Sequence, residues 1–232
     1  MERVFIRGVG IYPFSNCQEL LAFIGDHKGI LVAVNAEKLM KAEDQLKALV
    51  NQNIGYSDGM GAIWALRTKG HKNIERIPGV ELWLKIIENG LDTKSFYLVG
   101  GQEEVIVETV KKLRCQFEGI NIVGYRNGYI KTDREKEALM NDIVSKKPDM
   151  VFVAMGSPKQ EMLMEEMARK HPAVYQGLGG SFDVFTSRIK RSPKLLQKLG
   201  LEWSYRLMKQ PSRFWRYLPL FRFFFLIITR RL

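Results

Sequence analysis

The chain has 232 residues, of which 46% are hydrophobic and 26% are charged, a composition that suits one globular α/β domain with an appendage. Its two cysteines, Cys17 and Cys115, are too few for a disulfide framework and match no metal-binding spacing, which favours a reducing compartment. The formal net charge is +11, which points to an anionic partner. The first residues, Met1 to Arg7, lack the long apolar core of a signal peptide.

Short β-rich runs alternate with amphipathic helical stretches through most of the chain. Strands are predicted at Gly29–Val34, Ile54–Ser57, Ser95–Val99, Asn121–Gly124, Met150–Ala154 and Ala173–Gly177. Helices are predicted between them, among others at Glu81–Glu88, Glu103–Cys115, Glu135–Ser145 and Lys159–Arg169. This alternation predicts an α/β fold with a parallel sheet covered by helices. In such sheets, ligands bind outside the carboxyl ends of the strands.

Polar or glycine-rich loops follow all six predicted strands. They contain, in chain order, residues 35–38, 56–59, 100–101, 124–129, 156–161 and 177–183. Because the carboxyl ends of parallel strands lie at one edge of a sheet, we expect these loops to outline one cleft.

Two glycine pairs, Gly100-Gly101 and Gly179-Gly180, follow predicted strands. Such pairs let the backbone approach a phosphate, and the next helix directs its N–H groups toward the anion. A plain tight turn explains either pair equally well. The full Gly-x-Gly-x-x-Gly fingerprint and a Walker A loop are absent, which disfavours nicotinamide cofactors and ATP hydrolysis.

The segment from Gly156 to Glu161 has the pattern of a strand end followed by a helix start. Ser157 is predicted to cap the helix and Pro158 to take its first position. Capping does not require Lys159 or Gln160. Because a lysine at a helix N-terminus is mildly unfavourable, an anionic ligand there is expected.

Asp58 and Arg76 also belong to predicted loops. A carboxylate at a strand end, as at Asp58, can accept a proton from a substrate hydroxyl, although Asp-Gly is also a common turn. Arg76 precedes the Ile-Pro-Gly sequence and is suited to bind a carboxylate or phosphate, and a solvated surface arginine is its other interpretation.

No metal-binding pattern is present in the sequence. There is no Asp-x-Asp pair, and the three histidines, His27, His71 and His171, form neither a triad nor a metal spacing. We therefore expect no metal and no cofactor. A bound diphosphate would be held by backbone amides and cationic side chains.

The excess charge lies in residues 188–232. This segment has one acidic residue, Glu202, and twelve basic ones: Arg188, Lys190, Arg191, Lys194, Lys198, Arg206, Lys209, Arg213, Arg216, Arg222, Arg230 and Arg231. It is also rich in Phe, Trp and Tyr, and its apolar stretch is broken by Pro219 and Arg222, so it falls short of the about 20 residues that span a bilayer. The pattern favours a helical segment lying at an anionic membrane surface, with a protein partner or nucleic acid as alternatives.

Several motifs in fixed order resemble those of the WecG/TagA/CpsF family of bacterial glycosyltransferases. They cover nearly the whole chain and lie at residues 34–38, 58–59, 76–79, 98–101, 154–161, 179–185, 191–194, 200–203, 205–207 and 210–213. The resemblance implies a Rossmann-like fold of the GT-E type, with a catalytic domain over residues 1–190 and a helical, membrane-docking appendage over 191–232. It implies an inverting, metal-independent hexosyltransferase that uses a UDP-sugar and a polyprenyl-diphosphate-linked N-acetylglucosamine. It also implies a cytoplasmic protein, peripheral on the inner face of the plasma membrane, with no nucleic-acid partner and an oligomeric state left open.

The resemblance assigns roles to several of the residues above. Asp58 matches the proposed catalytic base, and Asn35, Arg76 and Gln160 match residues around the donor sugar and diphosphate. Asp183 matches an acidic residue on the nucleotide side. Glycine pairs and cationic residues complete the set of expected ligand-binding residues. They are Lys38, Gly100, Gly101, Lys159, Gly179, Gly180, Arg206, Arg213 and Arg216.

The choice of donor sugar depends on two positions. The teichoic-acid branch of the family has a threonine where this chain has Ala33, and Lys38 resembles the branch that transfers N-acetyl-D-mannosaminuronate in enterobacterial common antigen synthesis. The expected donor is therefore UDP-N-acetyl-D-mannosaminuronate, and the expected acceptor is undecaprenyl-diphosphate-linked N-acetylglucosamine. Two alternatives stay open: transfer of N-acetylmannosamine or another UDP-hexose, and a membrane-bound adaptor that only binds a nucleotide sugar.

Overall fold

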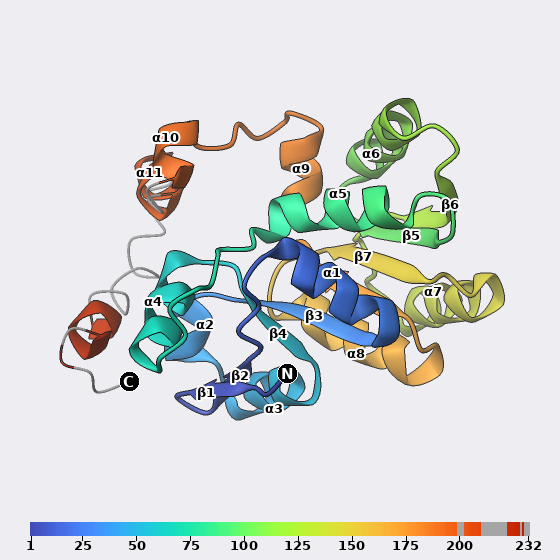
Figure 1. Ribbon diagram of the computed structural model, residues 1–232. Helices are drawn as coiled ribbons and strands as arrows, with labels where there is room; N and C mark the ends of the chain where they lie inside the picture. Colours follow the sequence, from blue (N-terminus) through green and yellow to red (C-terminus); the bar gives the residue numbers. More distant parts are fainter. Residues whose placement is uncertain (199–201, 210–221, 228, 230–232) are drawn as a thin grey trace. The chain divides into compact units, whose positions relative to one another are not determined.

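The computed structural model describes residues 1–198, 202–209, 222–227 and 229, without the side chains at 198, 203, 206 and 209. In this part, six strands form a parallel sheet in the order β4-β3-β8-β7-β5-β6, and two more form an antiparallel hairpin (Figure 1). The strands are β1 (Val4–Ile6), β2 (Val9–Ile11), β3 (Gly29–Val34), β4 (Ile54–Ser57), β5 (Ser95–Gly100), β6 (Asn121–Arg126), β7 (Met150–Ala154) and β8 (Val174–Gly177).

Helices connect these strands. They are α1 (Cys17–Asp26), α2 (Ala36–Lys41), α3 (Asp44–Gln52), α4 (Met60–Thr68), α5 (Gly79–Gly90), α6 (Glu103–Gln116), α7 (Asp133–Lys146), α8 (Lys159–Lys170), α9 (Ser181–Phe185), α10 (Lys194–Lys198) and α11 (Glu202–Lys209). The predicted α/β class and its helix-covered parallel sheet are confirmed. All six predicted strands form, with β5 and β6 extending one and two residues further and β8 starting one residue later.

The described chain divides into two compact units, which are interleaved in the sequence. Unit 1 comprises residues 1–17, 33–78 and 190–232, and unit 2 comprises residues 18–32 and 79–189. The division passes through β3, and each unit is described by itself below.

Unit 2 is built on β5, β7 and β8, whose side chains are almost entirely buried. Parallel pairing places Phe96 opposite Met150 and Gly100 opposite Ala154. Helices α5 and α6 cover one side of these strands, and α7 and α8 cover the other (Figure 1). The core has an aromatic centre in which the fully buried Trp83 meets Phe152 and Phe182 edge to face. Buried runs of this kind are expected for strands covered on both faces.

Unit 1 contains a hairpin that the sequence did not predict. β1 and β2 are three residues each and pair antiparallel through a turn at Arg7 and Gly8, which both have positive φ. The Asn51 side chain of α3 holds this hairpin, because it donates to Gly8 O at 2.8 Å and accepts from Gly10 N at 2.7 Å. Gly55 of β4 lies against Gly10, where a Cβ would come within 2.4 Å of the Gly10 carbonyl oxygen.

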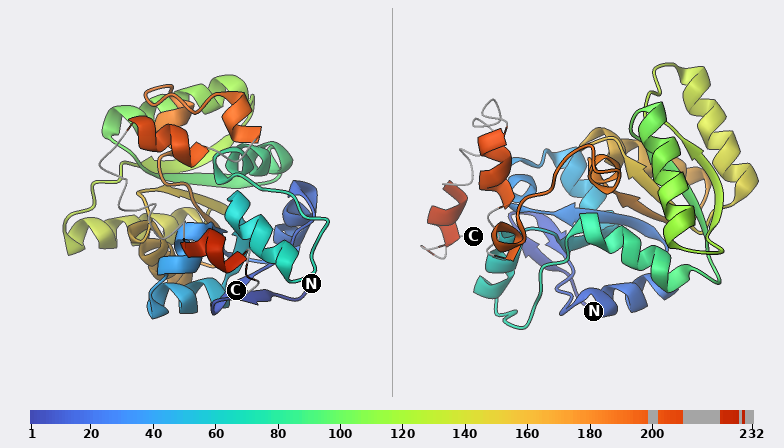
Figure 2. Two further views of the ribbon diagram at one scale, coloured as in Figure 1. Left: turned by 90° about the vertical axis from the view of Figure 1, so that its left-hand side faces the viewer. Right: turned by 90° about the horizontal axis from the view of Figure 1, so that it is seen from above.

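The basic segment contributes packed structure to unit 1. Residues 222–227 are helical and lie beside α4 (Figure 2). Phe223 is fully buried, and a Cβ added at Gly61 would come within 2.9 Å of its ring. Phe224 packs on Trp64 with ring centroids 5.3 Å apart, while Phe225 is 61% exposed. In the part of the chain that the structure describes, no helix is both long and apolar enough to cross a bilayer.

Candidate active site

Asn35 links the end of β3 to α2. It has extended backbone angles and caps α2, because its Oδ1 accepts the Lys38 N–H at 2.9 Å. An asparagine at this position satisfies one of the amides that a helix start leaves without a partner. The Lys38 ammonium in turn donates to Ala33 O at 3.0 Å, so this cation lies at the end of β3.

Asp58 directly follows β4, and its backbone is joined to the end of β3. The Asp58 N–H donates to Val34 O at 3.1 Å, and the residue is half-buried. The next residue, Gly59, lies so close to Asn35 that a Cβ there would be 3.2 Å from the Asn35 Cβ. Unit 1 therefore brings the Asp58 and Asn35 backbones together at adjacent strand ends, as the sequence predicts for loops that follow parallel strands.

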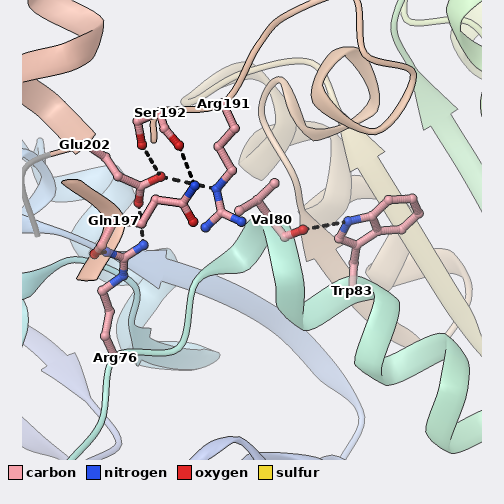
Figure 3. A network of polar contacts seen from close by, with 7 residues as sticks. All are labelled: Arg76, Val80, Trp83, Arg191, Ser192, Gln197 and Glu202. Carbon is pink, nitrogen blue, oxygen red and sulfur yellow. Dashed lines mark hydrogen bonds and ion pairs between the residues drawn. The ribbon is translucent and has the colours of Figure 1, made fainter. Parts of the chain in front are cut away.

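Arg76 is the centre of a polar network in unit 1, which includes Glu202 of α11 (Figure 3). Its Nη2 pairs with Glu202 Oε2, and its Nη1 donates to Gln197 O at 3.1 Å. Arg191 Nε donates to the other carboxylate oxygen of Glu202 at 3.3 Å, and Ser192 Oγ donates to that same oxygen at 3.4 Å. The alternative of a solvated surface arginine is therefore wrong for Arg76, whose side chain is only 14% exposed.

The Glu202 carboxylate is stabilised in its charged form. Burial alone raises its pKa, but the charges of Arg76 and Arg191 and their hydrogen bonds outweigh burial, so the pKa lies below the usual value. Glu202 is also the first residue of α11, where the positive end of the helix favours a carboxylate. It is therefore ionised at neutral pH.

The glycine pair at the end of β5 packs tightly within unit 2. A Cβ at Gly100 would come within 2.3 Å of Ala154 O, and the Gly101 N–H donates to that same oxygen at 3.1 Å. Gly128 N donates to Gly101 O at 2.9 Å, which ties the loop after β6 to this turn. Close packing accounts for both glycines here, and their contact with a phosphate stays a prediction.

Gln160 joins the loops that follow β7 and β8. Its Oε1 accepts the N–H of Gly156 at 3.2 Å and the N–H of Gly179 at 2.9 Å, and only 5% of the residue is exposed. Its Nε2 lies 3.4 Å from Glu161 Oε1. The side chain thus fixes the spacing of two glycine-rich loops, and the predicted contact with the donor stays a prediction.

The predicted cap of α8 is wrong. Helix α8 begins at Lys159, and its cap position is Pro158, which has no side chain that could cap it. Ser157 is exposed and precedes a cis peptide bond to Pro158. Lys159 lines a cavity of about 280 Å³ with Lys136, Pro158, Met162, Leu163 and Glu166. Lys159 is exposed, whereas Gln160 beside it is buried.

The loop after β8 leads into α9, a short helix that begins at Ser181 and carries Asp183 in its first turn. Gly179 has φ +58, and neither Gly179 nor Gly180 has an atom within 4 Å of an added Cβ, so this turn is open on the side of the missing side chains. Asp183 is half-buried.

The Arg206 side chain, Arg213 and Arg216 lie outside the described residues. Among the described residues, no group of three or more His, Cys, Asp or Glu side chains is arranged to hold a metal ion.

A family model for the glycosyl transferase WecG/TagA/CpsF family matches residues 6–232. The chain belongs to this family. Membership makes it a glycosyltransferase of polysaccharide synthesis, with a nucleotide-sugar donor and a lipid-linked acceptor in general terms. The polar residues of both units follow the carboxyl ends of strands, which is where α/β sheets bind ligands.

For a member of this family, the structure supports some site predictions more than others. It brings Asn35 and Asp58 together in unit 1, and it joins the loops of Gly156 and Gly179 in unit 2. That these groups border one cleft stays a prediction. The sequence predicted no role for Arg191 or for Glu202, whose carboxylate pairs with both Arg76 and Arg191. One signal was present: Glu202 is the single acid in a strongly basic segment, and such an acid is expected to have a specific cationic partner.

Proposed function

We propose that this protein is an inverting glycosyltransferase that moves N-acetyl-D-mannosaminuronate from UDP to the 4-hydroxyl of undecaprenyl-diphosphate-linked N-acetylglucosamine. Family membership over residues 6–232 supports the class of reaction. The observation that carries the assignment to specific residues is the proximity of the Asp58 and Asn35 backbones at adjacent strand ends.

The reaction is a single displacement. Asp58 accepts the proton of the acceptor hydroxyl while that oxygen attacks the anomeric carbon of the donor. The bond between the anomeric carbon and the UDP oxygen breaks as the new glycosidic bond forms, so the configuration inverts. UDP leaves with the bonding electron pair, and its growing charge needs stabilisation by cations and amides.

Asn35 and Lys38 are proposed to orient the donor sugar. The amide nitrogen of Asn35 can donate to a sugar oxygen, since capping of α2 uses only its Oδ1. Lys38 lies at the end of β3 and offers a cation to the uronate carboxylate. A hydrogen bond to a charged group contributes about 1.5–3 kcal/mol, enough to discriminate a uronate from an uncharged sugar.

The remaining predicted residues are proposed to bind the nucleotide and the lipid. Gly179, Gly180 and Asp183 are assigned to the nucleotide side, with Gln160 keeping Gly179 in place. The basic segment is proposed to hold the protein at the cytoplasmic face of the inner membrane, where it meets the lipid-linked acceptor.

A UDP-release assay with a panel of purified UDP-sugars and a diphosphoprenyl N-acetylglucosamine acceptor tests this function. We expect acceptor-dependent release that is fastest with the mannosaminuronate donor, and a loss of roughly 10²–10⁴-fold in turnover for Asp58→Asn. Asp44→Asn is a matched control, because Asp44 is an exposed carboxylate paired only with Lys47 among the residues described. Wild-type turnover by Asp58→Asn would remove Asp58 as the base. Donor binding without turnover by the wild-type protein would favour the adaptor.

A further inference from the structure

We propose that Arg76 and Arg191 form a two-arginine diphosphate-binding site, and that the Glu202 carboxylate occupies this site until a diphosphate replaces it. The inference rests on the proposed function, because the donor and the acceptor of that reaction both carry a diphosphate. It adds two residues, Arg191 and Glu202, and an exchange between an internal and an external anion.

The two guanidinium groups converge on one carboxylate within unit 1. Arg76 binds Oε2 of Glu202, and Arg191 binds Oε1 through its Nε at 3.3 Å (Figure 3). The side chains of Arg76, Arg191 and Glu202 are 14%, 23% and 15% exposed, so the site is largely buried but solvent still reaches it. An exposed surface pair contributes little, whereas a partly desolvated cluster of this kind is electrostatically stronger.

The Glu202 carboxylate is a planar anion with two oxygens, the kind of group that guanidinium groups bind well. Guanidinium groups bind carboxylates and phosphates through the same planar fork of N–H donors. In this structure the fork of Arg76 is engaged, because Nη1 donates to Gln197 O and Nη2 to Glu202. A diphosphate that takes the Nη2 contact of Arg76 therefore has to replace Glu202.

The charge of the cluster also favours the exchange. The two guanidinium groups carry +2 and Glu202 carries −1. A diphosphate carries at least two negative charges. Because attraction between opposite charges is stronger in a partly desolvated site than in water, two arginines attract a diphosphate more strongly than a single carboxylate.

Glu202 also connects this site to the basic segment. It is the first residue of α11, and Gln197, which accepts from Arg76 through its backbone oxygen, belongs to α10. Release of Glu202 therefore frees α11 from Arg76, whereas α10 keeps its own bond to Arg76 through Gln197 O. Binding of a diphosphate would then be coupled to the position of α11 within unit 1.

The experiment measures diphosphate affinity by isothermal titration calorimetry in the full chain and in Glu202→Gln. Glutamine keeps the shape of the side chain but removes the charge that competes for the arginines. We expect Glu202→Gln to bind diphosphate about tenfold more tightly, equivalent to about 1.4 kcal/mol. The double variant Glu202→Gln with Arg191→Gln should lose most of this gain. Glu165→Gln, which breaks the ion pair of Glu165 with Arg169 in unit 2, is a matched control and should bind as wild type does.

Three probes identify the source of the diphosphate. UDP represents the donor, farnesyl diphosphate the lipid-linked acceptor, and inorganic diphosphate the shared group. A gain for UDP assigns the site to the donor, and a gain for farnesyl diphosphate assigns it to the acceptor. Unchanged or weaker binding of all three probes to Glu202→Gln would overturn the inference. If Glu202→Gln does not fold, Glu202→Asp, which keeps the charge but is one methylene shorter, carries the test, with about threefold tighter binding expected and unchanged binding overturning it.

The result separates this inference from the proposed function. If the wild-type protein releases UDP from a UDP-sugar but Glu202→Gln gains no affinity, only the exchange at Glu202 fails. If inorganic diphosphate binds more tightly to Glu202→Gln while no UDP-sugar is turned over, the two-arginine site stands and the proposed transfer from a UDP-sugar fails.

Discussion

Replacing Gln160 by alanine tests whether this side chain holds two loops together. The change removes the acceptor of the Gly156 and Gly179 amides, which lie 3.2 and 2.9 Å from Oε1. A buried donor left without a partner costs about 1–3 kcal/mol, and because both glycines are half-buried the lower end applies. We expect the free energy of unfolding to fall by about 2 kcal/mol. With a urea m-value of about 2 kcal/mol per molar, the midpoint shifts by about 1 M.

The assay follows urea unfolding by fluorescence with Trp83 as the only tryptophan, the other three being replaced by phenylalanine in every variant compared, because Trp83 is buried in unit 2 beside Phe152 of β7. Gln160→Glu is the comparison variant, since its carboxylate still offers an acceptor to both amides. A loss below about 0.5 kcal/mol for Gln160→Ala, together with failing UDP release, would show that Gln160 contacts the substrate instead.

Three further predictions concern the donor, metal and membrane. Lys38→Ala should slow UDP release from the uronate donor by at least tenfold more than from UDP-N-acetylmannosamine, and equal losses on the two donors would remove Lys38 from recognition of the carboxylate. EDTA should leave UDP release nearly unchanged, because the proposed groups that stabilise the diphosphate are arginines and amides; full loss that Mg²⁺ or Mn²⁺ restores would contradict this. Phe225→Ala should weaken sedimentation with anionic liposomes several-fold at unchanged stability, since Phe225 is 61% exposed, whereas Phe223→Ala should cost about 3–5 kcal/mol of stability. Wild-type sedimentation of Phe225→Ala would exclude this side chain from the membrane contact.

The sheet was largely predictable because most of its strands are short, mainly apolar runs next to glycine or polar residues. Met150–Ala154 is buried at every position, and no polar residue interrupts this apolar run, so the ends of the strand could be predicted. The β1–β2 hairpin was missed because each strand has only three residues and its turn lacks the usual Asn-Gly or Asp-Gly pair. Arg7 occupies a positive-φ position that an arginine seldom adopts. The order of the strands in the sheet depends on contacts between residues far apart in the sequence. The spacing of apolar residues along the chain does not reveal these contacts.

The candidate site was predictable only where a polar residue directly follows a strand. Asn35 and Asp58 were found because each comes next to the end of a strand. The ion pair of Arg76 with Glu202 joins residues far apart in the chain, and no local pattern specifies such a pairing. The cap at Ser157 was wrong because α8 begins at Lys159 and its cap position is Pro158, so Ser157 lies one residue too early in the chain. Similarly, the aromatic composition of residues 188–232 did not reveal that Phe223 is buried in unit 1.

The interleaved sequence of the two units has a consequence for synthesis. Every segment of unit 2 precedes residue 190, whereas unit 1 combines the earliest residues with the segment 190–232. Because a ribosome delivers the chain from its N-terminus, unit 2 can complete its core while unit 1 still waits for Phe223 and Glu202. During that interval, the apolar surface at Gly61 and Trp64 is uncovered and the Arg76 guanidinium has yet to meet its carboxylate. A nascent chain stalled before residue 202 would therefore present a finished unit 2 beside an unfinished unit 1, the kind of exposed surface that chaperones bind.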